Sequence, residues 1–242
     1  MLLILAAPAA AAVLAGYQAA QTAPAEDPLI AGFKKTTVAS VADAVDQVVG
    51  RRGYLAHDVR PVIAGQVVGR AVTALVRPAP PEKATPPLAV KHSVEMIDSA
   101  QPGEVGVIIM EGSLDVAAIG GLMATSAKAR GMAGMILDGA VRDVVEIRGL
   151  GLPVYARSVS PATAVGRYAS VAKQIEVNCA GVAIKPGDII VAGEDGVVAV
   201  PQEKAAAVLK RAQEIDERES QMVPLIKQHK SLQKVVEIFN RI

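Results

Sequence analysis

The scarcity of aromatic side chains is the feature that most limits how this chain can pack its core. The 242-residue sequence is 51% hydrophobic, yet it contains four Tyr, two Phe and no Trp. Many of its apolar side chains are therefore small or β-branched, a composition that suits helices lying close against a sheet. We expect an α/β fold whose length allows one domain of generous size or two small ones, and one is the better count.

Charge and cysteine content exclude several classes of function. Lys and Arg number 25 and Asp and Glu 24, so there is no basic excess to hold nucleic-acid phosphates. One cysteine rules out a disulfide framework and a structural zinc cluster. His57, His92 and His229 lie far apart, without metal-ligand spacing. Any metal would be held by carboxylates and water, which favours magnesium, manganese or calcium.

The N-terminal segment differs from the rest of the chain. Residues 2–16 are almost wholly apolar, and Ala23-Pro24-Ala25 has the form of a cleavage site. We expect residues 1–28 to be a signal peptide or a disordered extension, followed by a domain over 29–242 with a C-terminal helical tail. A signal peptide would place the protein outside the cytoplasm, in the periplasm; otherwise it is cytoplasmic. The apolar run is mostly Ala and is too short for a stable membrane span.

Apolar periodicity and turn residues predict the secondary structure. Asp188 follows a Pro-Gly turn, and residues 193–196 have the composition of a hairpin turn. Charged helical patterns follow residue 202, and Pro224 is expected to interrupt them. The predicted helices are 35–50, 88–100, 116–130 and 141–150, and the predicted strands are 62–76, 105–110, 134–137, 153–156, 175–177, 182–184, 189–192 and 197–200.

The segment most indicative of chemistry joins the end of a predicted strand to the start of a helix. The strand is expected to end at Asp138, which places Arg142 and Asp143 where ligands bind in open α/β sheets. Arg142 carries a planar donor fork suited to a carboxylate or enolate oxygen, and Asp143 offers oxygen to a hard cation. Glu146 is three residues further on and shares a helix face with Asp143. The alternative is that both acids simply favour the helix N-terminus, with Arg142 on the surface.

A second segment places two glycines inside an apolar, small-residue stretch. Gly120 and Gly121 precede Leu122 and Met123 in a predicted helix, where glycine lowers stability. Glycines are useful there if backbone amides must come close to an anion. Close packing of the helix on the sheet explains them equally well.

Several motifs together resemble the RraA-like family, which includes the class II pyruvate aldolases. The segment 138–143, in this setting, is the most specific of them. The resemblance covers roughly residues 30 to 220 and lies in residues 40–44, 120–125, 127–131, 138–143, 151–156, 185–188 and 195–201.

The resemblance implies a fold, an assembly and a site. It implies an α/β/α sandwich around a mixed sheet, of the swivelling-domain type, assembled as a homotrimer or as a hexamer with active sites between subunits. Asp143 then matches the ligand of a divalent Mg²⁺ or Mn²⁺, and Arg142 matches the arginine that stabilises a pyruvate enolate. The amides of Leu122 and Met123, after Gly120 and Gly121, match those that hold the pyruvate carboxylate.

One position departs from the aldolase pattern. The well-studied aldolases carry an acidic residue where this chain has Gly121, and that acid helps to organise water for proton transfer. Its absence favours decarboxylation, which needs no base to start, or an aldolase with a substitute base. Glu111 and Asp115 are candidates for the substitute. A further acid from the C-terminal helix of a neighbouring subunit would lie among Glu214, Glu217 and Glu219, and we select Glu219.

These observations predict a divalent-metal-dependent lyase for small 2-oxo dicarboxylic acids. It would decarboxylate oxaloacetate, or cleave 4-hydroxy-2-oxo acids by a retro-aldol reaction, and release pyruvate through a metal-bound enolate. The alternative is a non-catalytic member of the family that binds and regulates a protein partner. The retained pair of Arg142 and Asp143 favours the enzyme.

Overall fold

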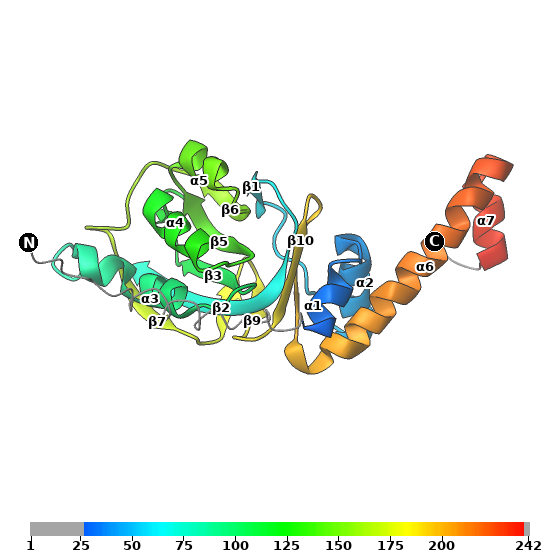
Figure 1. The fold of residues 1–242 in the computed structure, drawn as a ribbon, viewed down its shortest axis with the longest axis horizontal. Helices are drawn as coiled ribbons and strands as arrows, with labels where there is room; N and C mark the ends of the chain where they lie inside the picture. The colour runs from blue at the N-terminus through cyan, green and yellow to red at the C-terminus, as the bar shows by residue number, and fades with distance from the viewer. Residues whose placement is uncertain (1–26, 240–242) are drawn as a thin grey trace, which may run out of the picture.

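The computed structural model describes residues 27–239 and shows a mixed α/β fold around one curved sheet (Figure 1). Its nine strands follow the order β1-β6-β5-β3-β2-β10-β11, with β4 paired to β5 and β7 paired to β2, and a separate hairpin contains β8 and β9. The strands are β1 (Arg60–Ile63), β2 (Val67–Pro78), β3 (Val105–Met110), β4 (Ala117–Ile119), β5 (Gly134–Val141), β6 (Val154–Val159), β7 (Tyr168–Lys173), β8 (Val177–Cys179), β9 (Val182–Ile184), β10 (Ile189–Gly193) and β11 (Gly196–Val200). The helices are α1 (Pro28–Phe33), α2 (Val38–Val49), α3 (Pro86–Ser99), α4 (Gly121–Ala129), α5 (Val144–Leu150), the 3₁₀ turn η1 (Gln202–Lys204), α6 (Ala205–His229) and α7 (Leu232–Phe239).

The long strand β2 connects the two ends of the sheet. It pairs in parallel with β3 and antiparallel with β10 and β7. Its side chains alternate between the two faces of the sheet: Val67 and Leu75 belong to the core inside the curve, while Val68 and Val72 belong to two cores on the outside. This alternation follows from the period of two in a strand, and it lets one element contribute to all three cores.

Helices cover the outer face of the sheet in two groups (Figure 1). Helices α3, α4 and α5 pack over β2, β3, β5 and β6, whereas α1, α2 and α6 pack over β10 and β11. The inner face is covered by the hairpin of β8 and β9. Small side chains allow this close packing: Ala124 and Ala127 of α4 are fully buried against the sheet. The predicted mixed α/β layering around a mixed sheet is confirmed.

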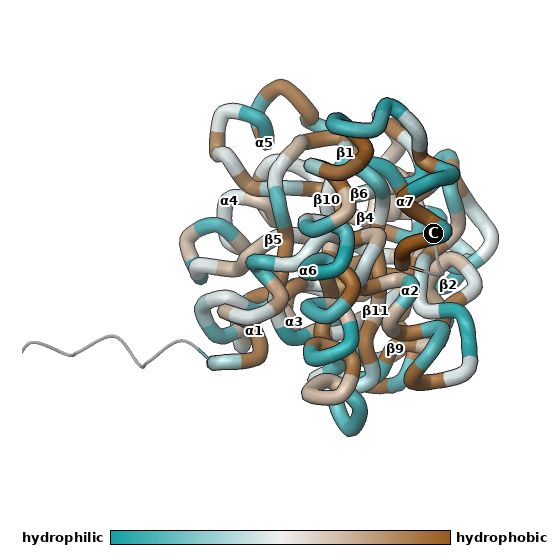
Figure 2. Tube along the Cα trace, turned by 90° about the vertical axis from the view of Figure 1, so that its right-hand side faces the viewer, coloured by the Kyte–Doolittle hydropathy of each residue, from teal (hydrophilic) through white to brown (hydrophobic). Residues whose placement is uncertain are grey.

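Helix α6 extends away from the body of the molecule (Figure 1). Its buried residues are concentrated near its start, where Ala205, Val208 and Ala212 contact the core beneath α1 and α2. The view from the α6 side shows hydrophilic residues along much of this helix (Figure 2). Pro224 lies inside α6, so the predicted interruption there is wrong. A proline ring fixes φ near its helical value but has no backbone N–H to donate within the helix. Because Pro224 is exposed, the missing hydrogen bond lies at the surface of the molecule.

Two predicted boundaries near the candidate site are corrected. The predicted helix 116–130 is a strand, β4, followed by helix α4, because Gly120 takes an extended conformation between them. The predicted strand 134–137 continues to Val141, because β5 is paired on both sides, with β6 and with β4. The strand β7 and the helix α1 were not predicted, whereas β3 and β9 have the predicted limits.

The described residues begin at Asp27, which caps α1 and accepts hydrogen bonds from Arg70 at 2.6 and 3.2 Å. The predicted signal peptide therefore lies almost wholly outside the described residues. Within residues 27–239, no helix is long and apolar enough to cross a membrane.

Candidate functional site

Two strand ends lie side by side and bring the two predicted segments together. Strand β4 pairs with β5, with Ile119 opposite Val141, so the residues that follow each strand are neighbours. The backbone N–H of Arg142 donates to the carbonyl of Ile119 at 3.2 Å, which holds the two turns against each other. We call the resulting group the amide cradle: Gly120, Gly121, Leu122 and Met123 on one side, and Arg142 and Asp143 on the other.

Asp143 is held in an unusual conformation that turns its carboxylate across the cradle. Its φ of 55° and ψ of 38° are left-handed, a region that Asp tolerates better than most residues. Although it occupies the N-cap of α5, it makes no capping bond there. Its Oδ2 instead accepts the N–H of Gly121 at 2.9 Å, and Arg142 Nε lies 3.7 Å from the same oxygen. The carboxylate therefore links the starts of two helices.

The two glycines are packed against charged side chains rather than against the sheet. A Cβ on Gly120 would lie 2.5 Å from Asp143 Oδ2 and 2.9 Å from Arg142 Nε. A Cβ on Gly121 would collide with the carboxylate of Glu146. Close packing on the sheet therefore does not account for these glycines, because both make room for charged side chains. That their amides approach an anion stays a prediction.

The start of α4 offers backbone amides to an anion. The first turn of a helix has N–H groups without intrahelical acceptors, and the N-cap Gly120 has no side chain to satisfy them. Gly121 N–H is bonded to Asp143, so the amides of Leu122 and Met123 are the ones suited to a ligand carboxylate. The Leu122 side chain is 88% exposed, so the cradle is open in the single chain.

The donor set fits a hard cation held by few protein atoms. Among residues 27–239, no group of three or more His, Cys, Asp or Glu side chains could enclose a metal. In that same range only Oδ2 of the Asp143 carboxylate has a hydrogen-bond donor, which leaves Oδ1 for a cation. Magnesium and manganese accept one carboxylate together with several waters. The cradle is therefore compatible with the predicted Mg²⁺ or Mn²⁺.

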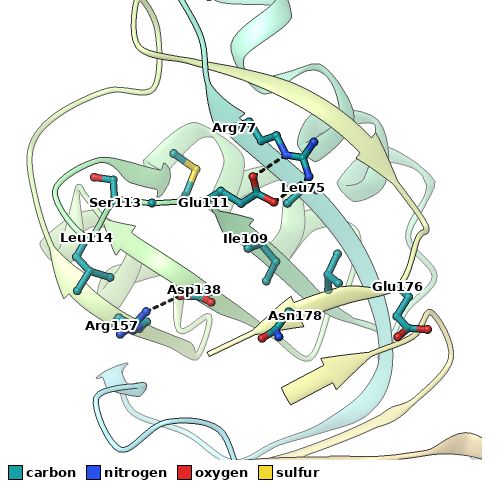
Figure 3. A pocket seen from close by; sticks show the side chains of 13 residues that line it. Leu75, Arg77, Ile109, Glu111, Ser113, Leu114, Asp138, Arg157, Glu176 and Asn178 are labelled. Carbon is teal, nitrogen blue, oxygen red and sulfur yellow. Dashed lines mark hydrogen bonds and ion pairs between the residues drawn. The ribbon is translucent and has the colours of Figure 1, made fainter. Parts of the chain in front are cut away.

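A cavity of about 470 Å³ lies elsewhere, inside the curve of the sheet (Figure 3). Arg157 donates to Asp138 at 3.0 Å and to Asp58 at 2.7 and 2.8 Å, a group that we call the Arg157 network. At the opposite wall, Arg77 donates to Glu111 at 2.5 and 3.1 Å. Both arginines that line this cavity are thus already paired with carboxylates.

Electrostatics in the Arg157 network favour the charged forms. Hydrogen bonds from Arg157 lower the pKa of Asp58, and those same bonds raise the pKa of Arg157. Asp138 also accepts the backbone N–H of Ala180 at 2.6 Å, so it joins β5 to the hairpin of β8 and β9. No sequence pattern predicts this network, because Asp58 and Arg157 are distant in the chain and carry no motif.

The other predicted residues are spread over the molecule. Glu111 is occupied by Arg77 in the inner cavity, and Asp115 is exposed, with no bond to its carboxylate among the described residues. Glu219 is exposed on α6, a helix that lies on the far side of α1 and α2 from α4 and α5 (Figure 1). Its predicted role from a neighbouring subunit stays a prediction.

The fold and the cradle define a class: α/β proteins in which helix amides, a guanidinium and a carboxylate lie around one place. The sequence model of the RraA-like family, described as Aldolase/RraA, matches residues 38–199. This chain therefore belongs to the RraA-like family.

Similar proteins have diverse names. A protein of Halalkalibacterium halodurans named "Putative 4-hydroxy-4-methyl-2-oxoglutarate aldolase" is 31% identical over 193 residues, covering 78% of this chain and 83% of that protein. An uncharacterized protein of Methanocaldococcus jannaschii is 34% identical over 135 residues, which are 55% of this chain and 64% of that protein. The crystal structure of Streptomyces coelicolor RraAS2, described as an unusual member of the RNase ES inhibitor RraA protein family, has a TM-score of 0.71 at 26% identity. That alignment covers 79% of this chain and 93% of the other.

Proposed function

We propose that this protein is a divalent-metal-dependent lyase for 2-oxo dicarboxylic acids that releases pyruvate. Its reactions would be decarboxylation of oxaloacetate, retro-aldol cleavage of 4-hydroxy-2-oxo acids, or both. The observation that carries the proposal is the amide cradle, in which Asp143, Arg142 and the first amides of α4 surround one place. The similarity to the protein of H. halodurans supports the same class of reaction.

Each group in the cradle has a task that its chemistry suits. The amides of Leu122 and Met123 would bind the substrate's 1-carboxylate at the positive end of α4. Asp143 would hold Mg²⁺ or Mn²⁺ with water, and the cation would stabilise negative charge as it develops on the 2-oxo oxygen. The guanidinium of Arg142 would donate to the same developing oxyanion, so that the protein binds the transition state more tightly than the substrate.

The surroundings of the cradle favour a further copy of the chain as its cover. Leu122 and Val145 are 88% and 81% exposed and flank the two helix starts. Two large apolar side chains beside an open site are typical of a surface that another protein covers. We include in the proposal a homotrimer or hexamer in which an acid of the neighbouring α6, Glu219, reaches this site.

Pyruvate release from oxaloacetate tests the function directly. The wild type and Asp143→Asn are assayed with Mg²⁺, with Mn²⁺ and with chelator, against the spontaneous rate at the same metal concentration. Asn also tolerates the left-handed conformation, so the variant should fold. We expect metal-dependent turnover in the wild type and a loss of about 10³-fold in the variant, similar to the removal of a major electrostatic stabiliser. Absence of metal-dependent turnover with any 2-oxo acid would refute the lyase.

The alternative is a non-catalytic regulator of a protein partner. It is favoured by the similarity to RraAS2, whose description names an inhibitor family. A regulator needs neither a cation at Asp143 nor a free amide at Leu122. The same assay separates the two: a regulator would bind its partner equally well as the wild type or as Asp143→Asn, and neither would release pyruvate.

A further inference from the structure

The carboxylate of Glu146 lies directly over Gly121 at the start of α4. A Cβ built on Gly121 would be 2.6 Å from Glu146 Cδ and 3.0 Å from its Oε1. Glu146 is exposed, and within residues 27–239 its carboxylate has neither a hydrogen bond nor an ion pair. An unpaired carboxylate therefore faces the cradle, next to the helix turn whose Gly121 N–H is bonded to Asp143.

The interaction of Glu146 with the dipole of its own helix does not explain why residue 121 is glycine. An acid in the first turn of α5 is favourable because of the helix dipole, whatever residue stands at 121. The structure shows more: any side chain at 121 would displace this carboxylate. Gly121 is not in a left-handed conformation, so the backbone does not require glycine there. Glycine at 121 instead leaves room for the Glu146 carboxylate to lie against the start of α4.

We propose that Glu146 is the proton-transfer group of this site, an inference that rests on the proposed lyase function. In retro-aldol cleavage, Glu146 accepts the proton of the substrate's 4-hydroxyl while the C3–C4 bond breaks. C4 becomes a carbonyl, and the electron pair of the broken bond passes to C3 and the 2-oxo group as the enolate of pyruvate. The same proton then returns from Glu146 to C3 and forms the methyl group of pyruvate.

Decarboxylation makes a different demand on the same residue. When C3–C4 of oxaloacetate breaks, carbon dioxide leaves with no proton removed, and the enolate takes its proton from water. Removal of the Glu146 carboxylate should therefore affect the two reactions unequally. This difference separates a proton-transfer role from a structural one, which would affect both equally.

The test compares Glu146→Gln with the wild type in three reactions at saturating Mn²⁺. These are oxaloacetate decarboxylation, cleavage of 4-hydroxy-4-methyl-2-oxoglutarate, and exchange of the pyruvate methyl protons in D₂O followed by NMR. We expect cleavage and exchange to fall by about 10²-fold or more and decarboxylation to stay within about 3-fold. Equal effects on all three reactions, or no effect on any, would overturn the proposal.

The wild type separates this inference from the proposed function. If the wild type acts on none of the three substrates, the lyase function fails and the role of Glu146 fails with it. If the wild type decarboxylates but neither cleaves nor exchanges, the lyase stands and Glu146 has no proton to transfer, so only this inference falls.

Moving the carboxylate provides a second variant that tests position. Gly121→Asp combined with Glu146→Ala places an acid from α4 in the space that Glu146 leaves. We expect this double variant to recover proton exchange at least about 10-fold over Glu146→Ala alone, with a melting temperature close to that of the wild type. Glu82→Gln, at an exposed glutamate outside the cradle, is the matched control and should leave all three rates unchanged. Failure of the double variant to exceed Glu146→Ala, when it is folded, would count against the proposal.

Discussion

The amide cradle and the Arg157 network use similar residues for opposite purposes. Both place arginine and aspartate near β5. In the network, Arg157 donates to both carboxylates at 2.7 to 3.0 Å, and the Ala180 amide also donates to Asp138, so that among the described residues only Asp58 Oδ1 is buried without a partner. In the cradle, Arg142 remains 3.7 Å from Asp143, and Glu146 has no partner among residues 27–239. Charges that the fold pairs hold the molecule together, while charges that it leaves unpaired are available to a ligand.

The largest effect is expected on turnover, from a substitution in the amide cradle. Arg142→Lys keeps the positive charge but removes the planar fork that can reach a developing oxyanion. We expect kcat/KM for oxaloacetate to fall by about 10³-fold, with the melting temperature almost unchanged, because Arg142 makes no short ion pair. A variant with near-normal kcat/KM would show that Arg142 is only a surface residue.

The next effect should appear in stability and not in turnover. Arg157→Met leaves Asp58 and Asp138 without their common partner. Both carboxylates are largely shielded from water, so water cannot fully replace that partner. We expect unfolding to become easier by about 2–3 kcal/mol in a denaturant titration, with unchanged turnover per folded molecule.

Arg77→Met is the matched control for this change. The ion pair of Arg77 and Glu111 is more exposed, with side chains 55% and 41% accessible, so its loss should destabilise the fold much less than the loss of Arg157. If Arg157→Met also abolished turnover in folded protein, the inner cavity would be part of the active site. The Arg157 network would then not be purely structural.

A smaller effect is expected from filling the cradle. Gly120→Ala would place a methyl group where it meets Asp143 Oδ2 and Arg142 Nε, so both side chains must shift. The backbone of Gly120 is extended, with φ −135°, so alanine adds no backbone strain. We expect about a 10-fold loss of kcat with little change in melting temperature. An equal loss for Gly149→Ala, which has open space above it, would mean that the effect is not specific to the cradle.

The sequence predicted the cradle better than it predicted the network, for physical reasons. Gly120, Arg142 and Asp143 belong to short segments at the ends of elements, where residue type reveals local geometry. The partners Asp58, Asp138 and Arg157 meet only because the sheet curves, and no periodicity in the chain encodes that curvature. The contact of Glu146 with Gly121 joins two helix starts that only the pairing of β4 with β5 places together. The predicted helix over 116–130 missed β4 for the same reason, since a three-residue strand is stabilised by its partner.

The smallest expected effect concerns acid stability, and it tests whether the network is structural. Arg157 lowers the pKa of Asp58 below its ordinary value near 3.8, so the unfolded chain binds a proton more readily than the folded one. The resulting stabilisation is complete above that ordinary pKa and is lost as the pH falls through the lower, folded value. Asp58→Asn should be less stable than the wild type at pH 7, and the difference should shrink as the pH falls below about 4. Urea titrations at pH 7, 5, 4 and 3 measure this convergence. A constant difference across these pH values would mean that Asp58 stabilises the fold through packing rather than through its charge.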